Sequence, residues 1–235
     1  MKLVILAGGY GTRLSEETKI KPKPLVKIGN RPIIWHIMKF YSYYGINDFI
    51  ICLGYKGHIL IKELKKFISK ESWNIRFVQT GLKTMTGGRI KKIEKYVSDE
   101  ENFCLSYGDG LSDVNIKNLI NFHKKNKKMA TLTAVRYKNP KGVLIFSRNS
   151  KVKKIKEKPI EYINGGFFVL SKKIFKFLKD SKTVFERDCL PKLTKQKELI
   201  AFKHNGFWAC MDTLREKKEL NKIFKSKEKA WKVWM

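Results

Sequence analysis

The first 126 residues alternate between short apolar runs and segments of helical spacing, and this alternation restricts the chain to few folds. Four runs rich in apolar residues have the length and composition of strands, at residues 2–7, 48–55, 74–80 and 102–110. Between them, helical spacing is found at residues 30–45, 58–68 and 87–97. Strands that alternate with helices form a parallel sheet that binds ligands at the carboxyl ends of its strands. The sequence therefore predicts an α/β fold.

The pattern changes after Asn126. Short strands with little helix between them are expected at residues 129–137, 142–147, 151–158 and 165–171. Helices are expected to return at 171–179 and 184–195, before a strand near 198–203 and a last helix from about Thr213. The chain has no internal repeat and no low-complexity linker. We therefore expect a single domain over residues 1–235, whose halves cover about 1–126 and 127–235.

The charge of the chain is strongly positive, at +30 from 51 Lys and Arg against 21 Asp and Glu. Such a balance raises nucleic acid as a partner. However, only eight of the 51 basic residues are arginine, and the lysines are spread along the whole chain. A solvated, lysine-rich surface is the favoured interpretation, so nucleic acid is not expected as a partner. A basic nucleic-acid-binding protein stays open as the alternative from another class of function.

The cysteines and the apolar runs indicate in which cellular compartment the protein is expected. None of the four cysteines has a partner at zinc-ligand spacing, and Cys52 and Cys104 lie in apolar runs, as buried free thiols do. No apolar stretch approaches the ~18 residues that span a bilayer. These features predict a cytoplasmic protein in a reducing compartment, with no membrane as a partner.

A glycine-rich segment, "LAGGYGTRLSEETKIKPKP", follows the first strand from Leu6 to Pro24. It is not a P-loop, because no Lys-Ser/Thr pair follows the glycines at that spacing, and Leu14 breaks the G-x-G-x-x-G pattern. A turn that exposes backbone N–H groups beside Arg13 suits a phosphate chain. Lys23 lies between two prolines, on a stiff extended segment. The alternative is a turn followed by a solvated basic loop.

Two aspartates are candidate metal ligands. Asp109 lies between two glycines at the end of a buried strand, a position that suits Mg²⁺ with phosphates on its other side. An ordinary aspartate turn is the alternative. Asp212 precedes the last helix, where a helix N-cap is the favoured local interpretation and a second Mg²⁺ ligand the alternative. Asp113 is expected to cap a helix at 114–125 instead of binding metal.

The remaining polar candidates carry weaker signals. Glu157 and Lys158 lie at a strand end, and charged strand ends are usually solvated. The four histidines form no ligand spacing, and His36 lies among core residues of a helix, which predicts a structural role.

The order of motifs resembles the sugar-1-phosphate nucleotidyltransferase family across nearly the whole chain. The resemblance rests on the glycine-rich segment and on "PIIWHIMKFYSYYGINDFIICLGYKG", "MTGGR", "YGDGLSDVNI", "INGGFFVL", "GFWACMDTLREK" and "WKVW". It implies a Rossmann-like fold with a mixed, mostly parallel central sheet flanked by helices. Within the family, the motifs are most similar to members that combine CTP with α-D-glucose 1-phosphate, releasing pyrophosphate and giving CDP-glucose for deoxysugar, O-antigen and lipopolysaccharide synthesis. The same reaction with UTP, dTTP or another hexose 1-phosphate is the alternative.

The resemblance also implies roles for individual residues. Arg13 and Lys23 would act on the reacting phosphates, and Asp109 and Asp212 would hold Mg²⁺. The implied nucleotide-binding residues are Leu6, Ala7, Gly8, Gly9, Tyr10, Gly11, Thr12, Arg13, Lys23, Thr84, Gly88, Arg89, Gly108 and Asp109. The implied sugar-phosphate-binding residues are Glu157, Lys158, Asn164, Gly165 and Gly166. The half over about 1–126 would thus bind the nucleotide and the half over about 127–235 the sugar phosphate.

Three segments depart from the family pattern: a shorter stretch between "GYKG" and "NIRFVQT", Lys141-Gly142 before a strand, and Ala209-Cys210 before "MDT". A catalytically silent relative would lack Asp109, Asp212 or Lys23, and this chain has all three. The expected partners are CTP, glucose 1-phosphate and further copies of the chain in a homo-oligomer.

Overall fold

The computed structural model describes residues 1–226 and 230–234. Its centre is a seven-stranded sheet in the order β12-β8-β11-β6-β1-β4-β5. The strands are β1 (Leu3–Leu6), β4 (Asp48–Leu53), β5 (Asn74–Gln79), β6 (Asn102–Tyr107), β8 (Ala130–Lys138), β11 (Ile160–Ser171) and β12 (Leu199–His204). Within this sheet β11 is the only antiparallel strand among the described residues. The predicted mixed, mostly parallel α/β sheet is confirmed.

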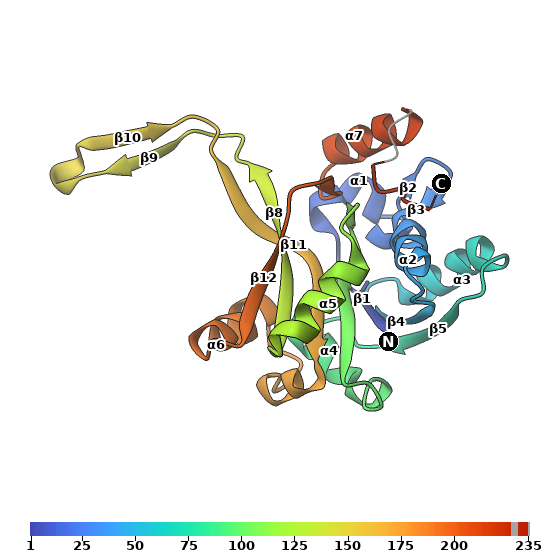
Figure 1. Cartoon of the computed structure of the whole chain (residues 1–235). Coiled ribbons are helices and arrows are strands. Elements are labelled where there is room, and N and C mark those ends of the chain that lie inside the picture. The colour runs from blue at the N-terminus through green and yellow to red at the C-terminus, as the bar shows by residue number, and fades with distance from the viewer. Residues whose placement is uncertain (227–229, 235) are drawn as a thin grey trace.

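Helices cover both faces of the sheet (Figure 1). Alternate residues of β1 belong to two different cores, Leu3 and Ile5 to one and Val4 to the other, because successive side chains of a strand point to opposite faces. One core is closed by α2 (Ile33–Tyr43), α3 (Gly57–Ile68), α5 (Ile116–Asn126) and α7 (Leu214–Lys225). The other is closed by α4 (Thr86–Lys92) and α6 (Leu190–Lys195). None of the described helices has the length and apolar composition to cross a membrane.

Two helices, α2 and α5, begin at other residues than the sequence predicts. The helix expected from Asn30 begins at Ile33, since Arg31 and Pro32 form the short strand β3 (Arg31–Pro32) against β2 (Lys27–Ile28). The N-cap of α5 is Asn115, whose side chain accepts a hydrogen bond from Asn118 N at 2.9 Å. The prediction that Asp113 caps this helix was therefore wrong.

Other elements are shorter or longer than predicted. The helix expected over 87–97 ends at Lys92 and is followed by the 3₁₀ turn η3 (Glu94–Tyr96). The helix expected at 171–179 is the 3₁₀ segment η5 (Lys172–Phe177). The strand expected at 165–171 begins earlier, so Asn164 to Gly166 lie inside β11. The short helix α1 (Ser15–Thr18) had no counterpart in the expectation.

A two-stranded sheet that the sequence did not predict joins distant parts of the chain. Strand β7 (Gly110–Ser112) pairs antiparallel with β13 (Trp208–Cys210), with Gly110 opposite Cys210. The pairing continues one step further, because Met211 N donates to Asp109 O at 2.9 Å. Asp109 and Asp212 are therefore brought together by backbone pairing.

The segment between β8 and β11 forms a hairpin arm of β9 (Val143–Phe146) and β10 (Val152–Lys156), which extends away from the rest of the molecule (Figure 1). Its cross-strand pairs include Phe146 with Val152 and Leu144 with Ile155. All four side chains are exposed, up to 65% at Ile155.

The end of the chain is anchored beneath α2 by a buried histidine. His36 Nε2–H donates to Ile28 O at 2.9 Å, and Trp231 Nε1–H donates to His36 Nδ1 at 3.3 Å. Burial lowers the pKa of His36 to about 4, so the ring is neutral at pH 7. The structural role predicted for His36 agrees with these contacts.

Candidate active site

A cavity of about 470 Å³ lies where β1 and β6 end, at the carboxyl edge of the parallel strands. The predicted residues that line it are Leu6 to Arg13, Lys23, Thr84, Arg89, Gly108, Asp109 and Asp212. The structure therefore gathers every residue predicted to contact the nucleotide or the metal, except Gly88, around one cavity.

The glycine-rich loop is held by Arg89, a buried arginine with only 5% exposure. Its Nη2 donates to Gly8 O at 2.9 Å, and its Nη1 donates to Leu53 O at 3.0 Å. A Cβ atom at Gly8 would lie 2.1 Å from Arg89 Nη1, so only glycine permits this contact. No described residue accepts a hydrogen bond from the backbone N–H groups of Gly9, Tyr10 or Gly11. These groups remain available to an anion in the cavity.

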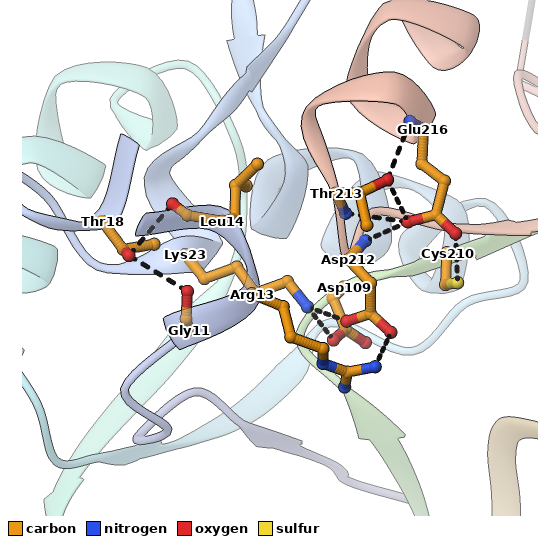
Figure 2. A network of polar contacts seen from close by, with 10 residues as sticks. All are labelled: Gly11, Arg13, Leu14, Thr18, Lys23, Asp109, Cys210, Asp212, Thr213 and Glu216. Atoms are coloured by element: carbon orange, nitrogen blue, oxygen red, sulfur yellow. Dashed lines mark hydrogen bonds and ion pairs between the residues drawn. The ribbon is translucent and has the colours of Figure 1, made fainter. Parts of the chain in front are cut away.

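A compact cluster of charges forms another part of the cavity wall (Figure 2). Lys23 Nζ lies 2.6 Å from Asp109 Oδ2 and 2.6 Å from Asp212 Oδ1. Arg13 Nη1 lies 2.7 Å from Asp212 Oδ2. Burial alone lowers the pKa of Lys23, but the two carboxylates outweigh it and hold this pKa above its ordinary value. Lys23 is therefore an ammonium at neutral pH.

The last helix begins with a cap that leaves Asp212 free to enter this cluster. The N-cap of α7 is Thr213, whose side chain accepts from Glu216 N at 3.2 Å. Glu216 Oε2 in turn accepts from Thr213 N at 2.8 Å and from Asp212 N at 2.7 Å (Figure 2). The favoured local interpretation of Asp212 as an N-cap was wrong, because a capping box at the next residue satisfies the helix end.

Gly88 lies outside the cavity lining and serves the packing of α4. A Cβ atom there would lie 2.6 Å from the Cα of Ser181 and 2.8 Å from Asp180 O. The glycine lets α4 approach the loop before η6 (Phe185–Cys189), a single turn of π-helix. Its predicted nucleotide contact stays a prediction.

The predicted sugar-phosphate residues fall into two groups. Asn164 lies against the cavity wall, donating from Nδ2 to the hydroxyl of Tyr107 at 3.2 Å and accepting from Gly166 N at 2.9 Å. Glu157 and Lys158 lie at the base of the arm, outside the cavity lining, with side chains 73% and 54% exposed. The structure thus does not bring these two residues together with the charge cluster around Lys23, and their role stays a prediction.

Comparisons with known proteins identify the family of this chain. A family model described as nucleotidyl transferase matches residues 2–225. The chain belongs to the nucleotidyl transferase family. This nucleotidyl transferase is 45% identical, over 257 aligned positions that cover all of both chains, to the glucose-1-phosphate cytidylyltransferase of Salmonella typhimurium. It is 42% identical to the probable glucose-1-phosphate cytidylyltransferase of Bacillus subtilis, again over the full length of both.

A solved structure supports the fold independently. The crystal structure of HddC from Yersinia pseudotuberculosis matches with a TM-score of 0.77 at 28% identity, covering 95% of this chain and 99% of that one. The alignment with the Salmonella typhimurium enzyme spans 257 positions against 235 residues here, so parts of that alignment have no counterpart in this chain. This difference is in line with the shorter segment noted in the sequence.

Nucleotidyl transferases generally use a divalent metal ion. The donor set of this chain fits such an ion, because the carboxylates of Asp109 and Asp212 approach a single cationic atom, Lys23 Nζ, from two directions. The described residues contain no group of three His, Cys, Asp or Glu side chains that could hold a metal. Two carboxylates with phosphate oxygens supplied by a substrate suit Mg²⁺, which is seldom held by an all-protein cage.

Sequence reasoning missed three residues of this nucleotidyl transferase that line the cavity with side-chain oxygens: Tyr107, Thr86 and Glu186. Tyr107 stands directly before Gly108-Asp109, and Thr86 lies in the "MTGGR" segment, so both belong to motifs that carry the family resemblance. Glu186 lies far from every quoted motif and carried no signal of its own.

Proposed function

We propose that this protein transfers the cytidylyl group of CTP to α-D-glucose 1-phosphate, giving CDP-glucose and pyrophosphate. The observation that carries the proposal is the convergence of Lys23, Arg13, Asp109 and Asp212 beside the glycine-rich loop in one cavity. The choice of CTP and glucose 1-phosphate is supported by the names of the relatives at 45% and 42% identity over full length.

The proposed nucleophile is a phosphate oxygen of the sugar 1-phosphate, which attacks the α-phosphorus of CTP while pyrophosphate leaves. The second pKa of a phosphomonoester is about 6, so this oxygen is largely an anion at neutral pH and needs no general base. The difficulty lies in bringing two polyanions together. Arg13, Lys23 and the free N–H groups of the glycine-rich loop supply the charge and the hydrogen bonds that hold the triphosphate in line.

Asp109 and Asp212 would hold the Mg²⁺ ion, which when bound neutralises charge on the triphosphate and on the departing pyrophosphate. Lys23 Nζ lies 2.6 Å from an oxygen of each carboxylate, so the two acidic side chains are close enough to bind one cation between them. We infer that Lys23 then turns from the carboxylates to the phosphates. The long, flexible lysine side chain allows this change without movement of the backbone.

We assign the nucleotide to the half over about 1–126 and the sugar phosphate to the half over about 127–235. Asn164, Gly165 and Gly166 on β11 would face the hexose, and Glu157 and Lys158 at the arm base would approach the sugar phosphate. Asp212 crosses this division, because the β7–β13 pairing carries it to the nucleotide side.

Pyrophosphate release from a matrix of four nucleoside triphosphates and several hexose 1-phosphates tests the proposal. Cytosine offers an exocyclic amine and an unprotonated ring nitrogen where uracil offers a carbonyl and an N–H. Each buried mismatch costs about 1–3 kcal/mol, so kcat/KM for CTP is expected to exceed that for UTP by at least about tenfold. Equal use of CTP and UTP would overturn the cytidylyl assignment. No turnover in any combination, with tight DNA binding instead, would favour the nucleic-acid alternative.

We also propose that the chain forms a homo-oligomer through its arm. A two-stranded hairpin is marginally stable alone in water, and Leu144, Phe146, Val152 and Ile155 expose apolar surface on it. A second copy of this same apolar surface is the occupant that a self-complementary contact requires. Light scattering coupled to size exclusion is expected to find an oligomer whose mass falls in a Phe146→Lys, Ile155→Lys double variant. Tyr43→Lys, at another exposed aromatic, is the matched control, and an unchanged mass in the arm variant would refute the proposal.

A further inference from the structure

We propose that Glu186 is a specificity-determining residue that accepts hydrogen bonds from hydroxyl groups of the hexose. The proposal rests on the function proposed above and extends it to a residue that has no role in the phosphate chemistry. Glu186 lines the same cavity as Asp109 but belongs to η6, on a different segment from the charge cluster.

The turn that carries Glu186 is rigidly mounted. Phe185 is fully buried and packs edge-on against Phe168 of β11, with ring centroids 5.5 Å apart. Asp188 accepts from Val184 N at 2.7 Å, which closes the start of the turn. Single π-helical turns are frequent at functional sites, where they present one side chain in a fixed direction. The backbone at Glu186 is therefore held from both sides.

Two hydroxyl groups orient the carboxylate. The Tyr107 hydroxyl donates to Glu186 Oε1 at 2.5 Å, and Thr86 Oγ1 donates to Glu186 Oε2 at 2.6 Å. Each of these hydroxyl oxygens also accepts a hydrogen bond that fixes its position. The Tyr107 oxygen accepts from Asn164 Nδ2 at 3.2 Å, and the Thr86 oxygen accepts from Phe185 N at 2.9 Å. Burial, with Glu186 beside it, raises the pKa of Tyr107 well above its usual range, so this hydroxyl stays a donor.

The carboxylate keeps acceptor capacity that the protein does not use. An ionised carboxylate has about four lone-pair sites, and the two hydroxyl donors occupy two of them. In the described part of the chain no lysine or arginine forms an ion pair with Glu186, and the neighbouring Arg187 instead pairs with Asp188 at 3.1 Å. An unneutralised carboxylate repels phosphates and attracts neutral hydroxyl donors. The part of the substrate that suits Glu186 is therefore a polyhydroxylated one.

One branch of the hydrogen bonds around Glu186 leads to the strand assigned to the hexose. It runs from Glu186 through Tyr107 to Asn164, on the strand that carries the predicted sugar-binding residues. The other donor to Glu186, Thr86, lies between Thr84 and Arg89, which are predicted to bind the nucleotide. Arg89 itself and the glycine-rich loop make no hydrogen bond to Glu186 among the described residues. Glu186 therefore lies between the predicted nucleotide-binding segment and β11, and we assign it to the hexose because its hydrogen bonds continue through Tyr107 to Asn164.

A panel of glucose 1-phosphates that each lack one hydroxyl tests the assignment. In the wild type, removal of the hydroxyl that donates a hydrogen bond to Glu186 is expected to weaken binding of the sugar phosphate by about tenfold or more, because a buried acceptor loses its donor. In Glu186→Gln this particular penalty should shrink severalfold, while the penalties at the other positions stay the same. KM for glucose 1-phosphate should rise about tenfold in Glu186→Gln and KM for CTP should stay within about twofold.

Glu161→Gln, the same change at an exposed position of β11, is the matched control and should leave every value unchanged. Tyr107→Phe removes one of the two orienting donors and should shrink the same penalty, which provides a second variant if Glu186→Gln unfolds. Identical penalties at all hydroxyls in wild type and both variants would overturn the proposal, as would a rise in KM for CTP alone. If the wild type uses another hexose 1-phosphate, the proposed function falls, and the same panel built on that hexose still tests Glu186.

Discussion

Asp109→Asn and Asp212→Asn are each expected to lower kcat by about a thousandfold or more while leaving the fold intact. Both carboxylates lie 2.6 Å from the same Lys23 nitrogen and are proposed to share one Mg²⁺ ion. An amide keeps the size of the side chain but loses the charge that binds a hard cation, so either change removes the same ion. The Asp109→Asn, Asp212→Asn double variant should therefore be scarcely slower than either single variant.

Steady-state kinetics over a range of Mg²⁺ concentrations checks this expectation, with circular dichroism to confirm folding. Asp48→Asn is the matched control, because Asp48 lies at the start of β4, at the end of the sheet opposite the cavity. Among the described residues its side chain forms one hydrogen bond, accepting from Asn74 Nδ2 at 2.7 Å. Additive losses in the double variant would mean that the two carboxylates act separately. Near-wild-type activity in Asp212→Asn would remove this residue from the proposed metal site.

Lys23→Ala is expected to lower kcat by about a hundredfold or more with little change in KM for glucose 1-phosphate. Lys23 is assigned to the reacting phosphates of CTP, where a charge matters most as negative charge grows on pyrophosphate. The same change leaves Asp109 and Asp212 facing each other without the ammonium between them. The variant should therefore melt at a lower temperature than wild type in chelator, and Mg²⁺ should restore more stability to it than to wild type.

Lys158→Ala provides the contrast. Its predicted contact is with the sugar phosphate, so its loss should raise KM for glucose 1-phosphate and leave both kcat and the melting temperature nearly unchanged. Lys158 is 54% exposed and lies outside the cavity lining, which makes this a demanding test. Equal losses of kcat and KM in both lysine variants would refute the division of roles. An unchanged KM in Lys158→Ala would remove Lys158 from the sugar-phosphate site.

Local sequence was sufficient for the framework of the molecule. The strands β1, β4 and β6 coincide with apolar runs because a strand buried on both faces needs apolar side chains at nearly every position. The edge strand β5 alternates apolar and polar residues and is largely exposed or half-buried. The glycine-rich loop could be placed as well, since it follows the first strand directly. Lys23 and Asp109 could also be predicted as site residues, because each belongs to a motif that carries the family resemblance.

The roles of residues that depend on partners distant in the sequence could not be predicted from local sequence. Locally Asp212 resembles a helix cap, and only the β7–β13 pairing and the Thr213–Glu216 capping box release it toward Lys23. Asp113 was likewise predicted to cap α5, but the N-cap of that helix is Asn115. Glu186 lines the cavity, and its carboxylate accepts a hydrogen bond from Tyr107, a residue 79 positions earlier in the chain.

The division has a physical reason. Hydrophobic periodicity and glycine content act over a few residues, so the main strands, the approximate positions of the long helices and the glycine-rich loop were determined by the sequence alone. A carboxylate takes its role from the donors and cations that surround it, and these come from other elements of the fold. Which carboxylates surround Lys23, which accept from the hydroxyls of Tyr107 and Thr86, and which hold a helix end was therefore decided by the tertiary structure.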